Sequence, residues 1–369
     1  MRIYDYIIIG SGLFGSVLAE RLHTSGKSVF VIEKRMHTGG NCFSYADEAT
    51  GINIHKYGTH VFHTSYRDVW EYINRFTQFL PYQHKVYTTY HNKVFNLPIN
   101  LQTLNSFYAI NLKPAEVDAF LKTKQTKFTA PANFEEQVIN LIGSDLYHAF
   151  IKGYTEKQWG CRATELPAGL LDRIPIRRSF NDAYFDDIYQ GLPVNGYAAL
   201  FERLLDGISI ELGTDFFDDR TYWLQHCHRL IYTGPLDRYF NHTHGRLNWR
   251  SVRFEEQLLE LEDYQGTSVM NYADAEIPFT RIHEPRHLDR GKSYTPGKTI
   301  IQKEYPCFSE EKYYPVHLAA DEERLIKYQS LVSREYKTVF GGRLAEYKYY
   351  DMDDVIKAAL DEFTRLSCT

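Results

Sequence analysis

Several features that would assign this chain to a class at once are absent from its 369 residues. No stretch approaches the ~18 consecutive apolar residues of a membrane-spanning helix, so we expect no membrane span. The formal net charge is only −5, whereas a dedicated nucleic-acid-binding protein is usually strongly basic on one face. We therefore expect no nucleic-acid partner, although a local arginine cluster could still bind an anionic substrate.

Paired cysteines are also absent. The five cysteines are scattered, odd in number and form no C-x-x-C pair, which favours free thiols in a reducing compartment. The first predicted strand begins almost at the first residue, so we expect no signal peptide. These features predict a cytoplasmic protein.

A βαβ unit opens the chain. Tyr4–Ile9 is a short apolar run typical of a buried parallel strand. Leu13–His23 carries apolar residues at helical spacing, and Ser28–Ile32 predicts a second strand that ends at Glu33.

Three glycines join the first strand to the helix in the spacing Gly10-x-Gly12-x-x-Gly15. Gly10 permits a tight turn, Gly12 lets the backbone approach a pyrophosphate, and Gly15 lets helix and strand pack closely. The helix N-terminus offers amide donors to the phosphates, and Glu33 is placed to accept from the ribose hydroxyls. This unit predicts a dinucleotide-binding fold.

Two further segments favour FAD over NAD. A second glycine pair, Gly39-Gly40, follows the acidic residue, as in flavoproteins of the glutathione-reductase type. Gly341-Gly342-Arg343 precedes a last amphipathic helix that starts at Asp351 and whose positive N-terminus would face the flavin ring. No second G-x-G-x-x-G is present, so no separate NAD(P)H domain is expected.

The rest of the chain predicts two insertions in this fold, giving an α/β, Rossmann-like FAD-binding domain with an inserted helical domain and an inserted antiparallel β-sheet domain. Between residues 62 and 180 the pattern is largely helical, and from 247 to 305 it indicates antiparallel strands. Predicted helices are Arg67–Phe79, Lys113–Lys124 and Asn133–Ile151; a hairpin is predicted at Lys85–Leu97, and strands at Ser268–Tyr272, Phe279–Ile282, Thr299–Glu304, Arg229–Thr233 and Thr338–Phe340. The predicted domains are 1–80 with about 190–237 and 317–369 (FAD-binding), about 100–185 (helical, with a lid at 167–180), and about 81–99 with 238–316 (sheet).

Apparent metal motifs carry little weight. His283-Glu284-Pro285-Arg286-His287 matches the zinc-protease pattern H-E-x-x-H, but that chemistry needs both histidines on one helix face, and the central proline breaks a helix. His226 and His228 would share a strand face without a third ligand nearby in the sequence. We expect no metal.

Longer motifs give the chain a specific resemblance. The segments 153–160 (GYTEKQWG), 57–64 (YGTHVFHT) and 340–352 (FGGRLAEYKYYDM), together with the first glycine loop, resemble bacterial UDP-galactopyranose mutases over nearly the whole chain. The resemblance implies a flavin-dependent isomerase that interconverts UDP-galactopyranose and UDP-galactofuranose without net redox change. Reduced FAD would act as a nucleophile through N5 on the anomeric carbon, an external donor would reduce it, and the family forms dimers.

The resemblance also implies roles for individual residues. Two arginines, Arg173 in the lid and Arg281, would clamp the diphosphate as catalytic residues, and His60 would lie against the flavin. The implied substrate contacts are Phe150, Tyr154, Thr155, Trp159, Arg173, Tyr184, Arg250, Asn271, Arg281, Tyr314, Tyr349 and Asp351. The implied cofactor contacts are Gly10, Gly12, Leu13, Phe14, Gly15, Glu33, Lys34, Gly39, Gly40, Asn41, His60, Thr233, Gly234, Gly342, Arg343, Asp351 and Met352.

Two departures from the family pattern leave alternatives open. Thr59 stands where Ala or Pro is expected beside the flavin histidine, and His84 stands where many members have Asn. Either change fits tolerance or an altered sugar preference, for instance UDP-N-acetylgalactosamine. A flavin oxidoreductase of the amine-oxidase type shares the flavin segments but does not explain the 153–160 motif. A non-catalytic UDP-sugar-binding protein would not need the flavin site.

Overall fold

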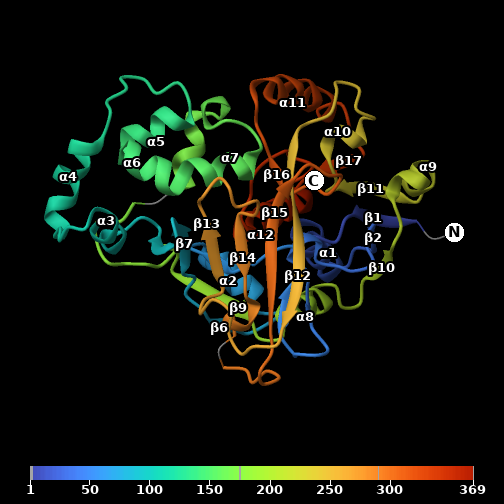
Figure 1. The fold of residues 1–369 in the computed structure, drawn as a ribbon. Helices are drawn as coiled ribbons and strands as arrows, with labels where there is room; N and C mark the ends of the chain where they lie inside the picture. The colour runs from blue at the N-terminus through green and yellow to red at the C-terminus, as the bar shows by residue number, and fades with distance from the viewer. Residues whose placement is uncertain (1–2, 174–175, 290, 369) are drawn as a thin grey trace.

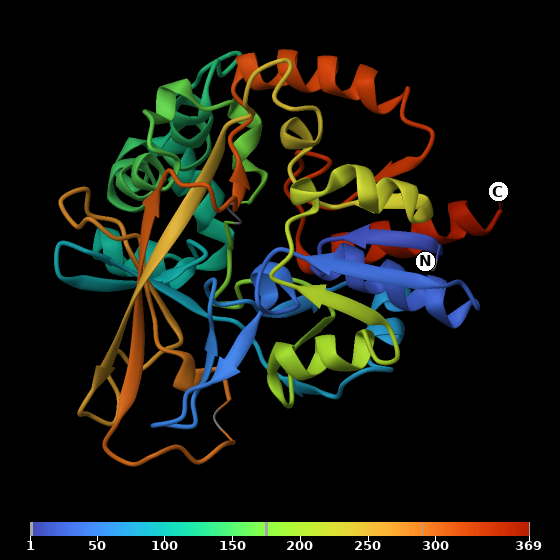
Figure 2. The same ribbon diagram turned by 90° about the vertical axis from the view of Figure 1, so that its right-hand side faces the viewer.

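The protein, seen in a computed structural model, is described over residues 3–173, 176–289 and 291–368, without the side chains of 171–173. The chain forms three parts: a parallel sheet with its helices, a group of helices, and a sheet with long antiparallel strands (Figures 1 and 2). The parallel sheet with its helices lies on the right of both views and the group of helices at the upper left. The long antiparallel strands extend downward between them in Figure 1 and below the helices, on the left, in Figure 2. The predicted α/β, Rossmann-like class with extra domains is confirmed.

A five-stranded parallel sheet forms the dinucleotide-binding part. Its first strand is buried, with Ile7 and Ile8 fully shielded from solvent, because apolar runs suit a sheet that is covered on both faces. Its strand order is β10 (Ser209–Leu212), β2 (Val29–Glu33), β1 (Tyr4–Ile9), β11 (Cys227–Tyr232) and β17 (Thr338–Phe340). All neighbours pair in parallel, so the loops that follow β1, β2, β11 and β17 share one edge.

Helices cover both faces of this sheet. On one face α1 (Leu13–Thr24) packs against α12 (Met352–Ser367), and their apolar stripes join a single core with the sheet. These are the two amphipathic helices that the sequence predicts. The same core includes α2 (Arg67–Ile73) and α8 (Gly196–Leu204). An aromatic cluster covers the other face of the sheet, with η6 (Phe216–Asp218), α9 (Arg220–Gln225) and α10 (Leu236–Tyr239). A further helix, α11 (Ala319–Val332), packs against α10.

A seven-stranded sheet forms the second layer. Its longest pair, β12 with β15, runs antiparallel from Ser251↔Cys307 to Leu259↔Thr299. The order is β16 (Tyr314–Pro315), β12 (Trp249–Leu259), β15 (Thr299–Cys307), β14 (Arg281–His283), β13 (Val269–Tyr272), β7 (Val86–Tyr90) and β8 (Lys93–Leu97). The predicted hairpin and the predicted strands at 268–272, 279–282 and 299–304 are confirmed within a few residues.

Two small sheets connect these layers. One has the order β5 (Phe62–Thr64), β9 (Tyr189–Pro193) and β6 (Phe79–Pro81); the other pairs β3 (Ser44–Ala46) with β4 (Asn53–His55), after the short η1 (Gly40–Cys42). The predicted helix Arg67–Phe79 is therefore wrong beyond Ile73. Residues 79–81 pair with β9 instead, so a tertiary strand pairing overrides the local helical spacing.

The helical part is more broken than its sequence pattern suggests. Its elements are α3 (Leu101–Tyr108), η2 (Pro114–Glu116), α4 (Val117–Lys124), α5 (Phe134–Ile142), α6 (Ser144–Leu146), η3 (Tyr147–Lys152), α7 (Gly153–Trp159), η4 (Ala163–Glu165) and η5 (Ala168–Arg173). The predicted continuous helix Asn133–Ile151 is wrong at Gly143, which adopts φ +88° and ends α5. Pro114 begins its helical segment as predicted.

Within the described ranges, no helix is long and apolar enough to cross a bilayer. All five cysteines are free thiols.

Candidate active site

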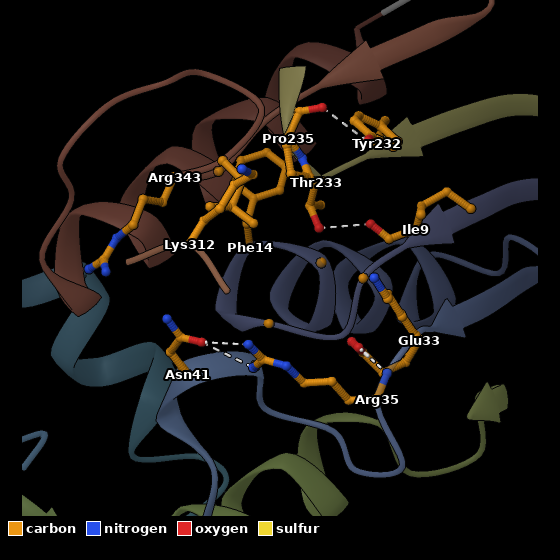
Figure 3. A pocket seen from close by; sticks show the side chains of 18 of the residues that line it. Ile9, Phe14, Glu33, Arg35, Asn41, Tyr232, Thr233, Pro235, Lys312 and Arg343 are labelled. Carbon is orange, nitrogen blue, oxygen red and sulfur yellow. Dashed lines mark hydrogen bonds between the residues drawn. The ribbon is translucent and has the colours of Figure 1, made fainter. Parts of the chain in front are cut away.

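The first cavity, of about 670 Å³, lies where β1, β2 and β11 end (Figure 3). Its floor is a close contact between backbones: a Cβ at position 15 would lie 2.0 Å from the Gly10 carbonyl oxygen. At position 10, where φ is +101°, a Cβ would lie 2.2 Å from the Thr233 hydroxyl oxygen. Only glycine fits at either position, as the fingerprint predicts.

Glu33 closes one side of this cavity. Its Oε2 accepts from the Ser11 amide at 2.8 Å and the Ser11 hydroxyl at 2.7 Å, and its Oε1 accepts from the Arg35 amide. The carboxylate is thereby held at the cavity edge with lone pairs left for ribose hydroxyls. Figure 3 shows Arg35 reaching across to Asn41, to which it donates at 3.0 Å.

Two helix N-termini open into the cavity. In the described chain no side chain caps α1 at Gly12 or α12 at Asp351, so their first-turn amides remain available to an anion. Asp351 holds the predicted N-cap position, but its carboxylate makes no capping bond. An elongated pocket with a backbone pyrophosphate cradle, an acidic ribose site and a second helix dipole fits FAD.

Nearly every predicted cofactor residue lines this cavity. Those residues are Gly10, Gly12, Leu13, Phe14, Gly15, Glu33, Lys34, Gly39, Gly40, Asn41, His60, Thr233, Gly234, Gly342, Arg343 and Met352. Asp351 lines the adjoining cavity instead.

The second cavity, of about 380 Å³, meets the first. Four residues line both: Asn41, His60, Arg343 and Met352. Burial lowers the pKa of His60 to about 4, so its ring is neutral at pH 7. Its Nδ1 lies 2.7 Å from the Gly58 carbonyl oxygen, which can only accept; Nδ1 therefore carries the proton and Nε2 keeps its lone pair.

Arg281 is the charged centre of the second cavity. Its guanidinium lies 5.6 Å from the centroid of the Tyr154 ring and 3.5 Å from Oε2 of the buried Glu304. Burial alone would lower the pKa of Arg281, but Tyr154 and Glu304 raise it well above its ordinary value. For Glu304 the effects have the opposite signs: burial alone would raise its pKa, but Arg281 and His283 lower it to about 2. Both groups are charged at pH 7, and the cation is available to an anionic ligand.

Unpaired polar atoms also gather here. Buried side-chain atoms that have no hydrogen-bond partner in the described structure include His84 Nδ1, Tyr154 Oη, Gln158 Oε1 and Asn271 Oδ1, and all four residues line this cavity. Buried polar atoms are rarely left unpaired, so this group indicates a polar ligand. Burial, with Arg281 nearby, lowers the pKa of His84 to about 3, so its imidazole is neutral.

Most predicted substrate residues lie on this cavity. They are Phe150, Tyr154, Thr155, Trp159, Tyr184, Asn271, Arg281, Tyr314, Tyr349 and Asp351. The rings of Tyr314 and Tyr349 stack at 5.9 Å with an interplanar angle of 13°. Burial raises the pKa of Tyr314, so its hydroxyl keeps its proton as a donor.

One predicted substrate residue with a described side chain, Arg250, is not brought to the cavity. Arg250 is buried elsewhere: its Nε donates to the Gln158 carbonyl oxygen at 2.8 Å, its NH2 donates to that of Lys157, and the guanidinium lies over Phe308. It secures the end of α7 rather than facing a ligand. The side chain of Arg173 lies outside the described residues.

The H-E-x-x-H segment is not an α-helix, as its proline predicts. His283 lies on β14, and η7 (Pro285–His287) follows. Asp263, Glu284 and His287 bring ligand atoms within 4.8 Å of one another. Both Glu284 oxygens already accept from the protein, one from the Tyr264 amide and the Thr299 hydroxyl and the other from the Gln265 amide, so internal hydrogen bonds explain this cluster.

Comparison with known proteins agrees with this geometry. The family model for UDP-galactopyranose mutase matches residues 149–349, and one for an NAD(P)-binding Rossmann-like domain matches 8–76. A Klebsiella pneumoniae protein named "Probable UDP-galactopyranose mutase" is 39% identical, over 98% of this chain and 95% of its own length. The chain belongs to the UDP-galactopyranose mutase family. A dTDP-fucopyranose mutase of Escherichia coli is 36% identical over 96% of each chain.

A solved structure supports the fold. The crystal structure of a reduced UDP-galactopyranose mutase covers this whole chain and 94% of its own, with a TM-score of 0.76 at 16% identity. Like its family, the protein is a flavoprotein isomerase, and its cofactor is FAD.

Sequence reasoning missed part of this mutase site. Gln158, His283 and Glu304 line the second cavity. Gln158 lies in the 153–160 motif and His283 in the H-E-x-x-H pattern, but neither was assigned to the site, and no motif marks Glu304. Glu304 could have been suspected as the single acid of the predicted strand Thr299–Glu304, because a carboxylate on a buried strand needs a buried partner.

Proposed function

We propose that this enzyme interconverts UDP-galactopyranose and UDP-galactofuranose. The observation that carries the proposal is the junction of the two cavities. The cavity that contains Arg281 and the unpaired polar atoms shares four lining residues with the FAD cavity, so a ligand bound there lies next to the cofactor. When bound and reduced, FAD supplies a nucleophile for the anomeric carbon of the sugar.

The chain's own residues bind the leaving nucleotide. Arg281 faces the diphosphate and stabilises the charge that develops as UDP departs. Tyr314 and Tyr349 donate hydroxyl hydrogen bonds to phosphate oxygens, and Arg343, 5.4 Å from the Tyr349 ring centroid, adds positive potential at the junction. Arg173 completes the clamp from the lid segment 167–180, of which Leu170 lines the cavity.

Other residues orient the two ends of the substrate. Phe150 and Trp159, with the Tyr154 ring, hold the uracil through apolar contact. Near the flavin, His60 Nε2 is an acceptor for a sugar hydroxyl, and Asn271 and His84 supply the unpaired atoms that a sugar would satisfy. Enclosure by the lid excludes water from the reacting carbon.

The wider setting belongs to the same proposal. The FAD-binding, helical and sheet domains have the boundaries given above, and the enzyme acts in the cytoplasm as a homodimer. An external donor reduces its FAD. Its product supplies cell-surface polysaccharide biosynthesis.

The test is turnover of a furanose substrate. The purified protein is reduced with dithionite, given UDP-galactofuranose, and the products are separated by chromatography. Conversion to UDP-galactopyranose in the reduced sample alone is expected. No conversion by flavin-loaded, reduced protein would reject galactose as the sugar.

A second substrate has a specific observation in its favour, the 36% identity to a dTDP-fucopyranose mutase. That substrate lacks the sugar 6-hydroxyl and the ribose 2′-hydroxyl and adds a methyl group to the base. The same assay with dTDP-fucofuranose, and with UDP-N-acetylgalactosamine in its furanose form, compares kcat/KM directly. The higher value identifies the substrate, and stoichiometric consumption of reductant would point to an oxidoreductase instead.

A further inference from the structure

His283, the first histidine of the H-E-x-x-H pattern, has both ring nitrogens hydrogen-bonded in the wall of the substrate cavity. Only 2% of the residue is exposed. Its Nδ1 lies 2.8 Å from the Thr59 hydroxyl, and its Nε2 lies 3.1 Å from Glu304 Oε2. No step of the proposed reaction uses this residue, yet two partners fix its ring.

Glu304 sets the direction of one of these hydrogen bonds. Glu304 is ionised at pH 7 and can only accept, so His283 Nε2 donates to it. A hydroxyl can either donate or accept, so Thr59 is a partner for Nδ1. The same Glu304 oxygen is the one that faces Arg281 NH1, and the other, Oε1, accepts from the Thr280 hydroxyl at 3.0 Å.

A continuous path therefore crosses the cavity wall from Thr59 through His283 and Glu304 to Arg281. At one end, Thr59 stands between Gly58 and His60, the backbone segment beside the FAD cavity. At the other end is the cation that faces the substrate. Without His283, Glu304 Oε2 keeps only the longer 3.5 Å contact with Arg281 NH1 and loses the donor that fixes the buried carboxylate from the other side.

We propose that His283 is a positioning residue for the mutase reaction: supported by Thr59, it holds the Glu304 carboxylate in the orientation that aims Arg281 at the substrate diphosphate. This inference rests on the proposed function in one respect, the contact of Arg281 with the diphosphate. It makes Thr59, where the resemblance led us to expect Ala or Pro, the support of this histidine.

The experiment compares the binding of UDP and of uridine to the FAD-loaded enzyme. Uridine lacks the diphosphate. A change in the orientation of Arg281 should therefore weaken the binding of UDP and leave the binding of uridine unchanged, whereas general damage to the cavity should weaken the binding of both. For H283F we expect the Kd of UDP to rise roughly tenfold, as for a lost hydrogen bond to a charged group. Flavin content and the Kd of uridine should stay at wild-type values.

Milder variants keep the test decisive if H283F folds poorly. H283Q can still donate to Glu304 and should recover most of the UDP affinity. T59V removes the supporting hydroxyl and should raise the Kd of UDP a few-fold, while T59S keeps it and should match wild type. Parallel weakening of UDP and uridine, or no change in either, would overturn the inference. Wild-type enzyme that binds UDP no better than uridine would instead remove the Arg281–diphosphate contact on which both proposals depend.

Discussion

The two cavities meet at four residues, yet they are built from different materials. The FAD cavity is a backbone structure: glycines in close contact, two uncapped helix N-termini and one acid whose oxygens are held by nearby amides. The substrate cavity is built of side chains, with Arg281, Tyr154 and Glu304 coming from β14, α7 and β15.

This difference predicts different responses to substitution. A binding site made of closely packed backbone leaves no room for a side chain, because a single added carbon meets a carbonyl oxygen. We therefore expect a substitution there to abolish FAD binding completely. A constellation of side chains loses one contact at a time, so its failure is graded and leaves the cofactor in place.

The largest effect is expected in the FAD cavity. Gly15→Ala would place a Cβ 2.0 Å from the Gly10 carbonyl oxygen, which the helix and strand cannot accommodate without separating. We expect protein without bound flavin and no measurable mutase activity. Flavin absorbance per mole of protein measures this directly. Gly291→Ala is the matched control, since its Cβ would lie 3.6 Å from its nearest neighbour, an ordinary contact; a normally loaded G15A would refute the backbone description.

A smaller effect is expected from Arg281→Lys. Lysine keeps the positive charge beside Glu304 but loses the planar fork that matches a diphosphate. We expect kcat/KM to fall on the order of 100-fold, as for removal of one oxyanion donor, with flavin content unchanged. Arg253→Ala, on the same sheet and exposed, should leave both quantities unchanged. Loss of flavin from R281K would show that the two cavities are not separable.

The smallest expected effect is on stability in acid. Burial lowers the pKa of His84 to about 3 and of His60 to about 4, below the ~6.5 of an unfolded histidine. As the pH falls from 7.5, the unfolded chain takes up protons first. The stability from keeping these rings neutral is present above pH ~6.5 and is lost as the pH falls toward the folded pKa values.

This pH dependence can be checked with a variant in which a residue that does not titrate replaces His84. Between pH 7.5 and pH 5 the free energy of unfolding should fall by about 2 kcal/mol for each such histidine. His84→Asn should reduce the total loss by about that amount in urea titrations at the two pH values. An identical pH dependence in H84N and wild type would contradict the neutral, buried state of His84.

Sequence alone determined the parts of the molecule that rest on local chemistry. The glycine spacing, the apolar first strand, Glu33 and the amphipathic last helix predicted the FAD cavity, because each acts through its own backbone or through neighbours in one βαβ unit. Local spacing failed where distant strands intervened: residues 79–81 pair with β9 despite a helical pattern.

Only the tertiary structure decided how the substrate side is assembled. Arg250 fits a family contact by sequence, but the fold directs its guanidinium onto carbonyl oxygens of α7. His283, in a pattern that suggested only a chance zinc motif, bonds instead to Thr59, which is 224 positions away, and to Glu304. The physical reason is that a charged or hydrogen-bonding side chain takes its role from its partners, and folding brings those partners together from segments whose spacing in the sequence carries no signal.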